Sequence, residues 1–295
     1  MNNKLRIAVT GSGGQLGNEL RFLAPSFPNW EFFFFSKAEW DIAIESLNEE
    51  HVLKLKPDVV INAAAYTNVE RAEDDQENAM IANGAAPGYL AKACKKNGAL
   101  LIYVSTDYVF DGKKSVPYEE NDDVHPLNVY GKSKLEGERS IDSVGNRYFI
   151  LRTSWLYGNY GHNFYKTMKR IGLEKGQLSV VNDQIASPTY SRFLAQDILE
   201  LIRLKLIEHK PIEYGLYHYT QTGEASWFDF AKEIVRVNHI NAHVDAVSSE
   251  RFPTKAKRPQ YSKLSTDQWI RNTGIALRSW QEGVQQCADD EQSHL

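Results

Sequence analysis

Short apolar runs alternate with helical patterns over the first half of the chain, and this order limits the possible folds more than any other feature. The runs lie at residues 5–11, 30–36, 58–65, 99–106 and 147–154. Each is almost continuously hydrophobic, as expected of a strand that is buried on both faces. Helical patterns separate the runs, at residues 14–24, 45–56, 78–96 and 130–142. Repeated strand–helix order predicts a Rossmann-like α/β fold built on a doubly wound parallel sheet.

The pattern changes after about residue 155, where the elements become shorter and loops more frequent. An aromatic-rich stretch follows at 215–237, and a basic stretch with prolines at 252–265. We therefore expect a cofactor-binding domain at 1–155 and a smaller α/β substrate-binding lobe at 156–295. Residues 190–222 are expected to pack back onto the first domain.

Composition excludes several classes of protein. The chain has 295 residues, of which 42% are hydrophobic, so it can bury a substantial core. A net charge of −4 gives no basic face for nucleic acid. No apolar run approaches the roughly 18 residues of a membrane-spanning helix, and the N-terminus lacks a signal-peptide pattern. These features predict a cytoplasmic protein with neither nucleic acid nor membrane as its partner.

Cysteine and histidine spacing gives no sign of a metal site or a disulfide. Cys94 and Cys287 are far apart in sequence and belong to no C-x-x-C motif, so we expect both to be reduced and structural. His239 and His243 lie four residues apart, but no third ligand lies near them in the sequence.

A glycine-rich turn follows the first apolar run. Gly11, Gly14 and Gly17 have the spacing G-x-x-G-x-x-G, with Gln15 and Leu16 between the last two. Glycines at a strand-to-helix turn allow backbone N–H groups to approach a pyrophosphate at the positive end of the helix. Because this turn opens a strand–helix series, we predict that it binds a dinucleotide.

The residues after the second and third runs bear on the choice of cofactor. Ser36 and Lys37 stand where an NAD-binding site usually carries an acidic residue for the ribose. A hydroxyl and an ammonium suit a 2′-phosphate, which favours NADPH, although Glu39 or Asp41 within reach of the ribose leaves NADH possible. Small residues follow the third run, and they would either let a cofactor lie against the sheet or serve ordinary packing of a helix on the sheet: Ala63, Ala64 and Ala65.

The stretch VYGKSKLEGE (129–138) places Tyr130 and Lys134 one helical turn apart. A nearby ammonium favours ionisation of a phenol, although an exposed surface pair is the alternative for this stretch alone. Thr106 and Asp107 end the fourth run, at the edge where doubly wound sheets bind ligands. Together Thr106, Tyr130 and Lys134 resemble the catalytic triad of the short-chain dehydrogenase/reductase superfamily, in its extended branch that acts on nucleotide sugars.

The resemblance is closest to the dTDP-4-dehydrorhamnose reductases, and it extends over nearly the whole chain. The matching segments are GGQLG, NAAAYTNVERAE, STDYVFDG, PLNVYGKSKLEGE, LRTSWLYG, NF, VVNDQIASPT and RPQYSKL. The resemblance implies reduction of the 4-keto group of dTDP-4-dehydro-β-L-rhamnose by NADPH, the last step of dTDP-rhamnose biosynthesis.

The chemistry of that reaction assigns a role to each member of the triad. A hydride that reaches C4 leaves an alkoxide, which needs a proton from a group within hydrogen-bond reach. We expect Tyr130 to supply it, with Lys134 and the oxidised nicotinamide lowering the pKa of the phenol toward neutrality. Lys134 is also expected to hold the nicotinamide ribose, as in the superfamily. Thr106 would hydrogen-bond the carbonyl oxygen, with a strand-end cap as its alternative role.

Candidate residues for the nucleotide sugar lie mainly in the second half. The Trp155 indole is suited to line a sugar or base pocket, and the Arg258 guanidinium to hold a diphosphate; a core role is the alternative for Trp155. Further substrate-binding candidates, by resemblance or by position, are Tyr66, Thr106, Asp107, Asn163 and Gln184.

The sequence departs from the family at one position. Some members pair through a magnesium site made of acidic residues, and Glu19 matches the first of these. The position after SPTYS, however, holds Arg192 instead of glutamate. A cation removes the negative charge that hard metals require. We therefore predict no bound metal and no metal-bridged dimer, and expect a monomer or a homodimer.

Three other functions share parts of this pattern. An epimerase or 4,6-dehydratase has the same glycine-rich turn and Tyr-x-x-x-Lys, but a dehydratase should carry an acidic pair directly after Thr106, where this chain has Asp107 and Tyr108. The regulatory subunit of methionine adenosyltransferase is a non-catalytic relative. The intact triad of this chain disfavours such a non-catalytic role. A reductase of another 4-keto nucleotide sugar is the leading alternative, because sequence spacing does not reveal the sugar or the base.

Overall fold

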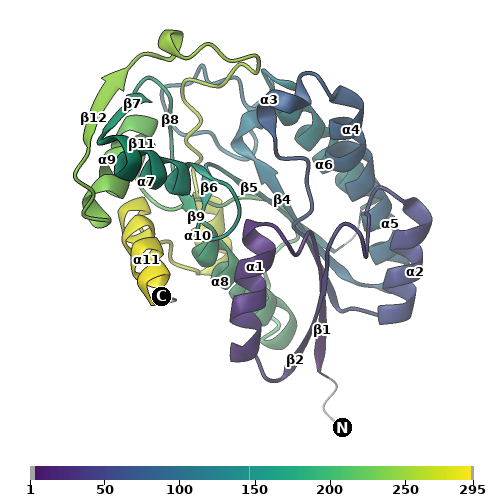
Figure 1. Cartoon of the computed structure of the whole chain (residues 1–295). Coiled ribbons are helices and arrows are strands. Elements are labelled where there is room, and N and C mark those ends of the chain that lie inside the picture. The colour runs from purple at the N-terminus through teal and green to yellow at the C-terminus, as the bar shows by residue number, and fades with distance from the viewer. Residues whose placement is uncertain (1–3, 146, 294–295) are drawn as a thin grey trace.

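A six-stranded parallel sheet forms the centre of the protein in the computed structural model, which describes residues 4–145 and 147–293 (Figure 1). In spatial order the strands are β10 (Gly215–His218), β5 (Tyr148–Thr153), β4 (Leu100–Thr106), β3 (Val59–Asn62), β1 (Leu5–Thr10) and β2 (Trp30–Phe35). All neighbouring strands run parallel. The predicted Rossmann-like α/β fold is confirmed, and the strand order reverses beside β1, where such sheets bind their ligands.

Helices cover both faces of this sheet. One face carries α1 (Gln15–Leu23), the 3₁₀ turn η1 (Ala24–Ser26), α8 (Ser191–Ile202) and the π-helical turn η4 (Arg203–Ile207). The other face carries α2 (Glu45–Leu55), α4 (Gln76–Met80), the π-helical turn η2 (Ile81–Ala85), α5 (Ala86–Asn97) and α6 (Val129–Val144), with the short α3 (Val69–Ala72) nearby. Separate apolar clusters fill the two faces, so the sheet is buried on both sides, as its hydrophobic strands require.

A smaller lobe stands beside the carboxyl ends of the sheet strands. Its strands form two-stranded pairs: β6 (Leu156–Tyr157) with β9 (Thr189–Tyr190), β7 (Gln177–Val181) with β12 (His243–Val247), and β8 (Ile185–Ala186) with β11 (Ala225–Ser226). Its helical segments are α7 (Phe164–Lys175), α9 (Trp227–Val237), η5 (Ser249–Arg251) and α11 (Trp280–Gln292). An aromatic cluster that includes Tyr157, Tyr190 and Phe230 forms its core.

The C-terminal part of the chain returns to the sheet at one helix. Trp269 of α10 (Asp267–Thr273) and Ile275 belong to the apolar cluster that underlies β10 and β5. The sequence analysis placed all of 156–295 outside the first domain apart from 190–222, so the structure differs here. Trp269 is fully buried against Tyr217 and Tyr219, and this buried apolar contact explains the return of the chain.

Close packing of α6 against β4 brings the helix to the edge of the sheet. Asn128 caps the helix by accepting a hydrogen bond from the Gly131 N–H at 2.7 Å. A Cβ atom at Gly137 would lie 2.1 Å from the Asn83 carbonyl oxygen and 2.6 Å from the Tyr103 hydroxyl, so only glycine allows this approach. The 3₁₀ turn η3 (Asp107–Val109) follows β4 and faces the start of α6.

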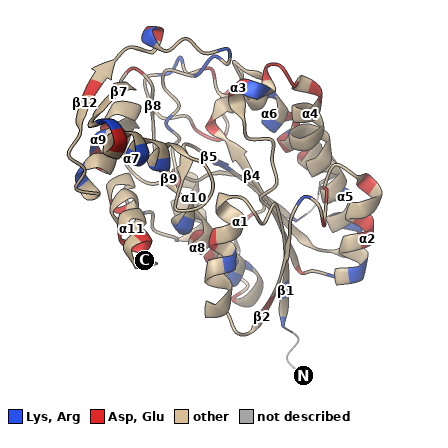
Figure 2. Ribbon diagram, in the orientation of Figure 1, with Lys and Arg blue, Asp and Glu red and all other residues tan. Residues whose placement is uncertain are grey.

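Acidic and basic residues are interspersed along the helices in Figure 2, consistent with the small net charge of −4. In the part of the chain that the structure describes, no helix is both long and apolar enough to cross a membrane. Cys94 and Cys287 are both free and buried, and burial raises the pKa of each thiol.

Candidate active site

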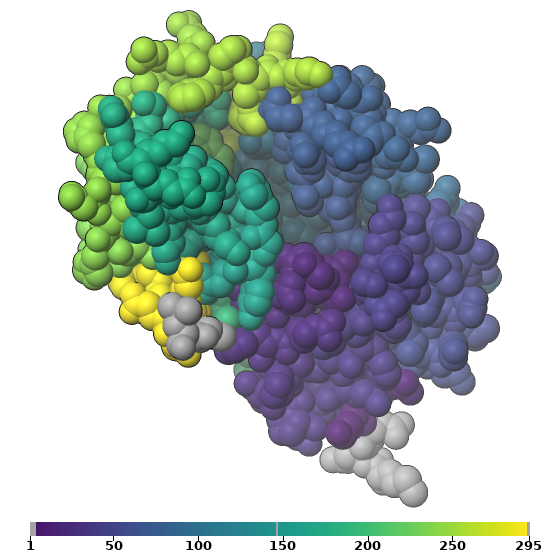
Figure 3. All heavy atoms as spheres, in the orientation of Figure 1, coloured from purple at the N-terminus to yellow at the C-terminus, as the bar shows by residue number. Residues whose placement is uncertain are grey.

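A cavity of about 1150 Å³ lies at the carboxyl ends of the sheet strands, where Figure 3 shows a recess between the lobes. It exceeds the roughly 300–1,000 Å³ that is usual for one small ligand, so it has room for a dinucleotide and a second ligand. The predicted residues that line it are Gly11, Gly14, Gln15, Leu16, Ser36, Lys37, Asp41, Ala63, Ala64, Ala65, Tyr66, Thr106, Asp107, Tyr130, Lys134, Trp155 and Asn163. The predicted residues Gly17, Gln184 and Arg258 do not line it.

The glycine-rich turn forms one end of this cavity. Gly11 has a φ of +68°, and a Cβ atom there would lie 2.5 Å from the Ala64 nitrogen. Gly13 faces open space, with no atom within 4 Å of where its Cβ would be. Backbone is thus exposed to the cavity at the start of α1, an arrangement that fits a pyrophosphate. Gly17 packs instead against the turn, since a Cβ there would lie 2.5 Å from the Ser12 Cα.

Beyond β2, the acidic residues Glu39 and Asp41 already interact with the polar residues that were expected to bind the cofactor. The Ser36 backbone N–H and hydroxyl both donate to the Glu39 carboxylate, at 2.8 and 2.7 Å. These hydrogen bonds lower the pKa of Glu39. Lys37 makes only a long ion pair with Asp41, at 3.8 Å, and its side chain is 83% exposed. Lys37 is therefore the group at this end of the cavity that can turn toward a 2′-phosphate at little cost.

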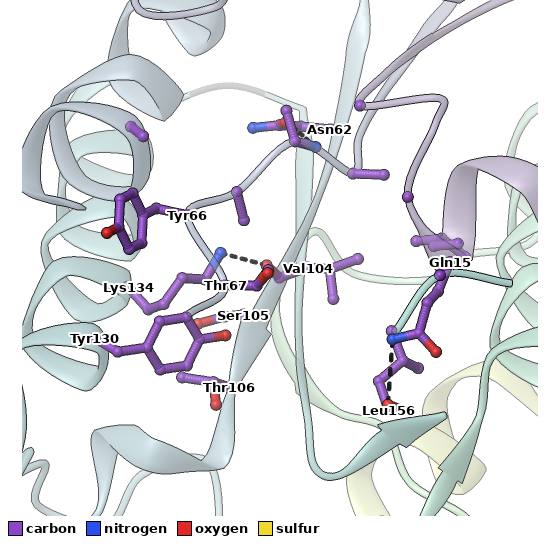
Figure 4. A pocket seen from close by; sticks show the side chains of 18 of the residues that line it. Gln15, Asn62, Tyr66, Thr67, Val104, Ser105, Thr106, Tyr130, Lys134 and Leu156 are labelled. Carbon is purple, nitrogen blue, oxygen red and sulfur yellow. Dashed lines mark hydrogen bonds between the residues drawn. The ribbon is translucent and has the colours of Figure 1, made fainter. Parts of the chain in front are cut away.

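The three residues of the expected triad converge on the other end of the cavity, as Figure 4 shows for Thr106, Tyr130 and Lys134. Thr106 is the last residue of β4, and the other two project from the first turns of α6. The Lys134 ammonium donates to the Val104 carbonyl oxygen at 2.7 Å and lies 3.9 Å from the Tyr103 ring centroid. Lys134 is 2% exposed, so the pair is not a surface pair.

Burial dominates the proton affinities in this cluster. Burial and the neighbouring Asp107 raise the pKa of Tyr130 to about 12, while a hydrogen bond with Thr106 opposes the rise. Burial lowers the pKa of Lys134 to about 7, although the Glu138 carboxylate favours its charged form. The expectation that Lys134 would move the pKa of Tyr130 toward neutrality is therefore wrong for the protein's own groups, because loss of solvation and the neighbouring Asp107 raise that pKa instead.

Asp107 is buried beside these groups and holds the second lobe against them. Its carboxylate accepts hydrogen bonds from the Ser262 hydroxyl at 2.5 Å and from the Thr106 hydroxyl at 3.2 Å. Burial raises the pKa of Asp107 to about 7 despite these hydrogen bonds. The contact with Ser262 joins residues 155 positions apart, a partnership that sequence spacing gave no means of predicting.

A pair of stacked indoles forms the wall that the smaller lobe contributes. The rings of Trp155 and Trp227 lie 3.5 Å apart and within 10° of parallel, and both line the cavity. Trp155 has a left-handed backbone with a φ of +46°, an uncommon conformation for a large side chain. Gln184 lies behind the pair, where it accepts a hydrogen bond from the Trp227 indole at 3.2 Å.

Trp227 was missed by the sequence analysis. A signal was present, since Ser226 and Asp229 form a capping box that starts a helix at Trp227. That signal predicts that the indole lies in the first turn of a helix. It does not predict that the indole lines the cavity.

Hydrogen bonds across the cavity join its two sides. The Asn163 amide donates to the Gln15 side-chain oxygen at 3.0 Å, which links the start of α7 to the start of α1. The Tyr66 backbone is held by Asn83 of η2, whose side chain accepts from its N–H and donates to its carbonyl. The Tyr66 hydroxyl donates to Asp75 at 3.0 Å. The loop after β3 is thereby fixed above Tyr130 and Lys134 (Figure 4).

Arg258 lies at the rim and is already paired. Its guanidinium donates to the Glu70 carboxylate at 2.7 Å, and Lys255 forms a second ion pair with Asp74 at 2.5 Å. Both pairs tie the segment before Ser262 to the region of α3. A diphosphate held by Arg258 would have to displace Glu70, so its expected role stays a prediction.

Glu19 of α1 and Arg192 of α8 form a buried ion pair, and neither residue lines the cavity. Glu19 is fully buried and accepts hydrogen bonds from the Arg192 guanidinium and, at 3.2 Å, from the Ser191 hydroxyl. Burial raises the pKa of Glu19, and Arg192 opposes the rise. Among residues 4–145 and 147–293, no group of three or more His, Cys, Asp or Glu side chains is placed to hold a metal ion.

The chain is similar over nearly its whole length to several known proteins. A dTDP-4-dehydrorhamnose reductase from Aggregatibacter actinomycetemcomitans is 40% identical, and the match covers 95% of this chain and 97% of that protein. The spore coat polysaccharide biosynthesis protein SpsK of Bacillus subtilis is 37% identical over 98% of each chain. The crystal structure of dTDP-4-dehydrorhamnose reductase from Bacillus anthracis in complex with NADP superposes with a TM-score of 0.91, at 40% identity over 97% of this chain and 99% of that one.

The family model described as the RmlD substrate binding domain matches residues 5–293. That match spans nearly the whole chain, both lobes and every residue of the cavity. The protein therefore belongs to the RmlD substrate binding domain family.

Proposed function

We propose that this protein reduces the 4-keto group of dTDP-4-dehydro-β-L-rhamnose with NADPH and so produces dTDP-β-L-rhamnose. The observation that carries the proposal is the convergence of Thr106, Tyr130 and Lys134 in one cavity whose far end is the glycine-rich turn. Relatives named for this activity, and the NADP complex of one of them, support it.

The cavity fits a dinucleotide along the carboxyl ends of β1, β2 and β3. The Gly11–Gly14 turn would take the pyrophosphate, and Ala63 and Ala64 leave room beside the sheet. Lys37, which is exposed and weakly paired, would take the 2′-phosphate of NADPH. When bound, NADPH supplies the hydride that adds to C4 of the keto sugar. Lys134 would hold the nicotinamide ribose.

Tyr130 is the proposed proton donor to the sugar oxygen. A phenol with a pKa of about 12 is fully protonated near neutral pH, and reduction of a ketone requires this form at the start. Asp107 and burial strengthen the hold on this proton, which a phenol with the ordinary pKa of 10.0 would also keep near neutral pH. Thr106 would donate a hydrogen bond to the same oxygen and stabilise its developing charge. To do so its hydroxyl must turn away from the Asp107 carboxylate.

The smaller lobe, within residues 156–295, is proposed to hold the nucleotide sugar against the cofactor domain. Trp155 and Trp227 offer a flat apolar surface for a sugar or base, and Tyr66, from the loop after β3, lines the same cavity. Asp107 and Asn163 present polar groups to the same space. Gln184 would act from behind by orienting Trp227, and Arg258 would reach the diphosphate after release from Glu70.

The direct test mixes purified protein with dTDP-4-dehydrorhamnose generated in situ and follows the oxidation of NADPH and of NADH. Fast oxidation with dTDP-rhamnose as product is expected, with NADPH the better cofactor. Oxidation only with a different 4-keto nucleotide sugar would reassign the substrate. NADPH binding without oxidation of any such sugar would favour a non-catalytic relative.

A further inference from the structure

Glu138 is a buried carboxylate that the mechanism above does not use. It is 6% exposed and lies on α6, one helical turn beyond Lys134. It accepts hydrogen bonds from the Ser105 hydroxyl at 2.5 Å and from two nitrogens of Arg152, Nε at 3.0 Å and Nη2 at 2.7 Å. Removing a charge from water costs free energy, even when hydrogen bonds hold it on two sides. A carboxylate buried in this way is therefore a candidate for a specific role.

The contacts of Glu138 continue a regular pattern between β4 and α6. The last three residues of β4 each contact one of three successive turns of the helix. Val104 accepts from Lys134, Ser105 donates to Glu138, and Thr106 hydrogen-bonds Tyr130. Tyr130, Lys134 and Glu138 lie on successive turns of one face of α6, with Lys134 in the middle, and the Glu138 carboxylate acts electrostatically on the Lys134 amine.

We propose that Glu138 is a positioning residue that keeps the Lys134 amine protonated, with Ser105 and Arg152 holding its carboxylate in place. The proposal rests on the role given above to Lys134, since only an ammonium holds the cofactor ribose and stabilises a phenolate at Tyr130. Glu138 itself does not line the cavity, so it would act through Lys134.

The other charged or titratable groups around Lys134 do not replace Glu138. Tyr103 on β4 offers only its ring face, and Tyr130 on the same helix is a neutral phenol. Asp107, from η3, acts on Tyr130. Arg152 on β5 is bound to Glu138, and His218 on β10 stays neutral because burial lowers its pKa to about 3. Burial brings the pKa of Lys134 to about 7, so a lost carboxylate changes its charge near neutral pH.

The test measures NADPH affinity by fluorescence, and kcat/KM, across the pH range for Glu138→Gln. Affinity should be lost at a pH roughly one unit lower than in the unchanged protein, so that binding near pH 7 weakens by up to about fivefold. Glu138→Asp keeps the charge and should restore most of the shift. Glu136→Gln is the matched control, because Glu136 lies on the outer face of α6, where its partner is Arg139 at 3.9 Å.

Removal of Glu138 alone leaves Arg152 buried without its partner, which endangers folding. The double variant Glu138→Gln with Arg152→Gln removes both charges and gives a second chance to see the shift. A folded double variant whose NADPH affinity falls at the same pH as in the unchanged protein would overturn the proposal. Binding needs no turnover, so an unchanged protein that binds NADPH but reduces no sugar would refute the proposed function and still allow this test.

Discussion

Lys134 should lower the free energy of unfolding of the protein, although the proposed reaction depends on this residue. The amine is 2% exposed, and burial lowers its pKa from 10.5 to about 7. One pKa unit corresponds to about 1.4 kcal/mol, so holding the ammonium in place costs on the order of 5 kcal/mol below pH 7. The hydrogen bond to Val104 and the contact with the Tyr103 ring offset part of this cost. A charged hydrogen bond contributes about 1.5–3 kcal/mol and a cation–π contact about 1 kcal/mol.

Lys134→Met is therefore expected to be inactive yet more stable than the unchanged protein, by about 1–3 kcal/mol near pH 6. The unfolded chain binds more protons at this site between the folded pKa of about 7 and the unfolded value of 10.5. The unchanged protein thus regains stability as pH rises through that window, and the advantage of the variant fades.

Urea unfolding of both proteins, followed by circular dichroism at about pH 6 and about pH 10, measures the difference. All other titrating groups are shared, so their effects cancel in the comparison. A variant that is less stable than the unchanged protein at the lower pH would refute the reasoning, because the hydrogen bond and the ring contact would then outweigh the cost of burial.

Three further variants test other parts of the account. Tyr130→Phe should lower kcat about 10²–10⁴-fold while NADPH affinity by fluorescence stays nearly unchanged, since only the proton donor is lost; near-normal turnover would refute its role. Trp227→Ala should raise KM for the nucleotide sugar and leave NADPH affinity intact, and an equal loss of both would show a general collapse of the cavity. Glu19→Gln should cost about 3–5 kcal/mol in urea unfolding because it leaves Arg192 buried with a weaker partner. Glu19→Gln combined with Arg192→Met should cost much less, and equal costs would contradict that explanation.

The sheet was predictable because its strands can be recognised from local sequence patterns. Strands that are buried on both faces must be nearly continuous in hydrophobic residues, and the glycine-rich turn and Tyr130–Lys134 spacing are local patterns. The convergence of Thr106 with these residues followed from one rule, that parallel strands end at the same edge of the sheet.

Contacts between distant segments were not predictable. The stacking of Trp227 on Trp155 and the bond from Ser262 to Asp107 depend on how the smaller lobe folds back, which no local pattern specifies. The pKa of Tyr130 was misjudged for a related reason. The sequence reveals the neighbouring ammonium but not the depth of burial, and burial decided the outcome.

The central claim is that hydride addition at C4 is completed by a proton from Tyr130. It is tested most directly with NADPH that carries deuterium at the transferred position of its nicotinamide, by NMR and mass spectrometry of the sugar product. The account predicts dTDP-rhamnose with one deuterium at C4, formed rapidly by the unchanged protein and very slowly by Tyr130→Phe. Product without deuterium at C4, or equal rates for the two proteins, would contradict it.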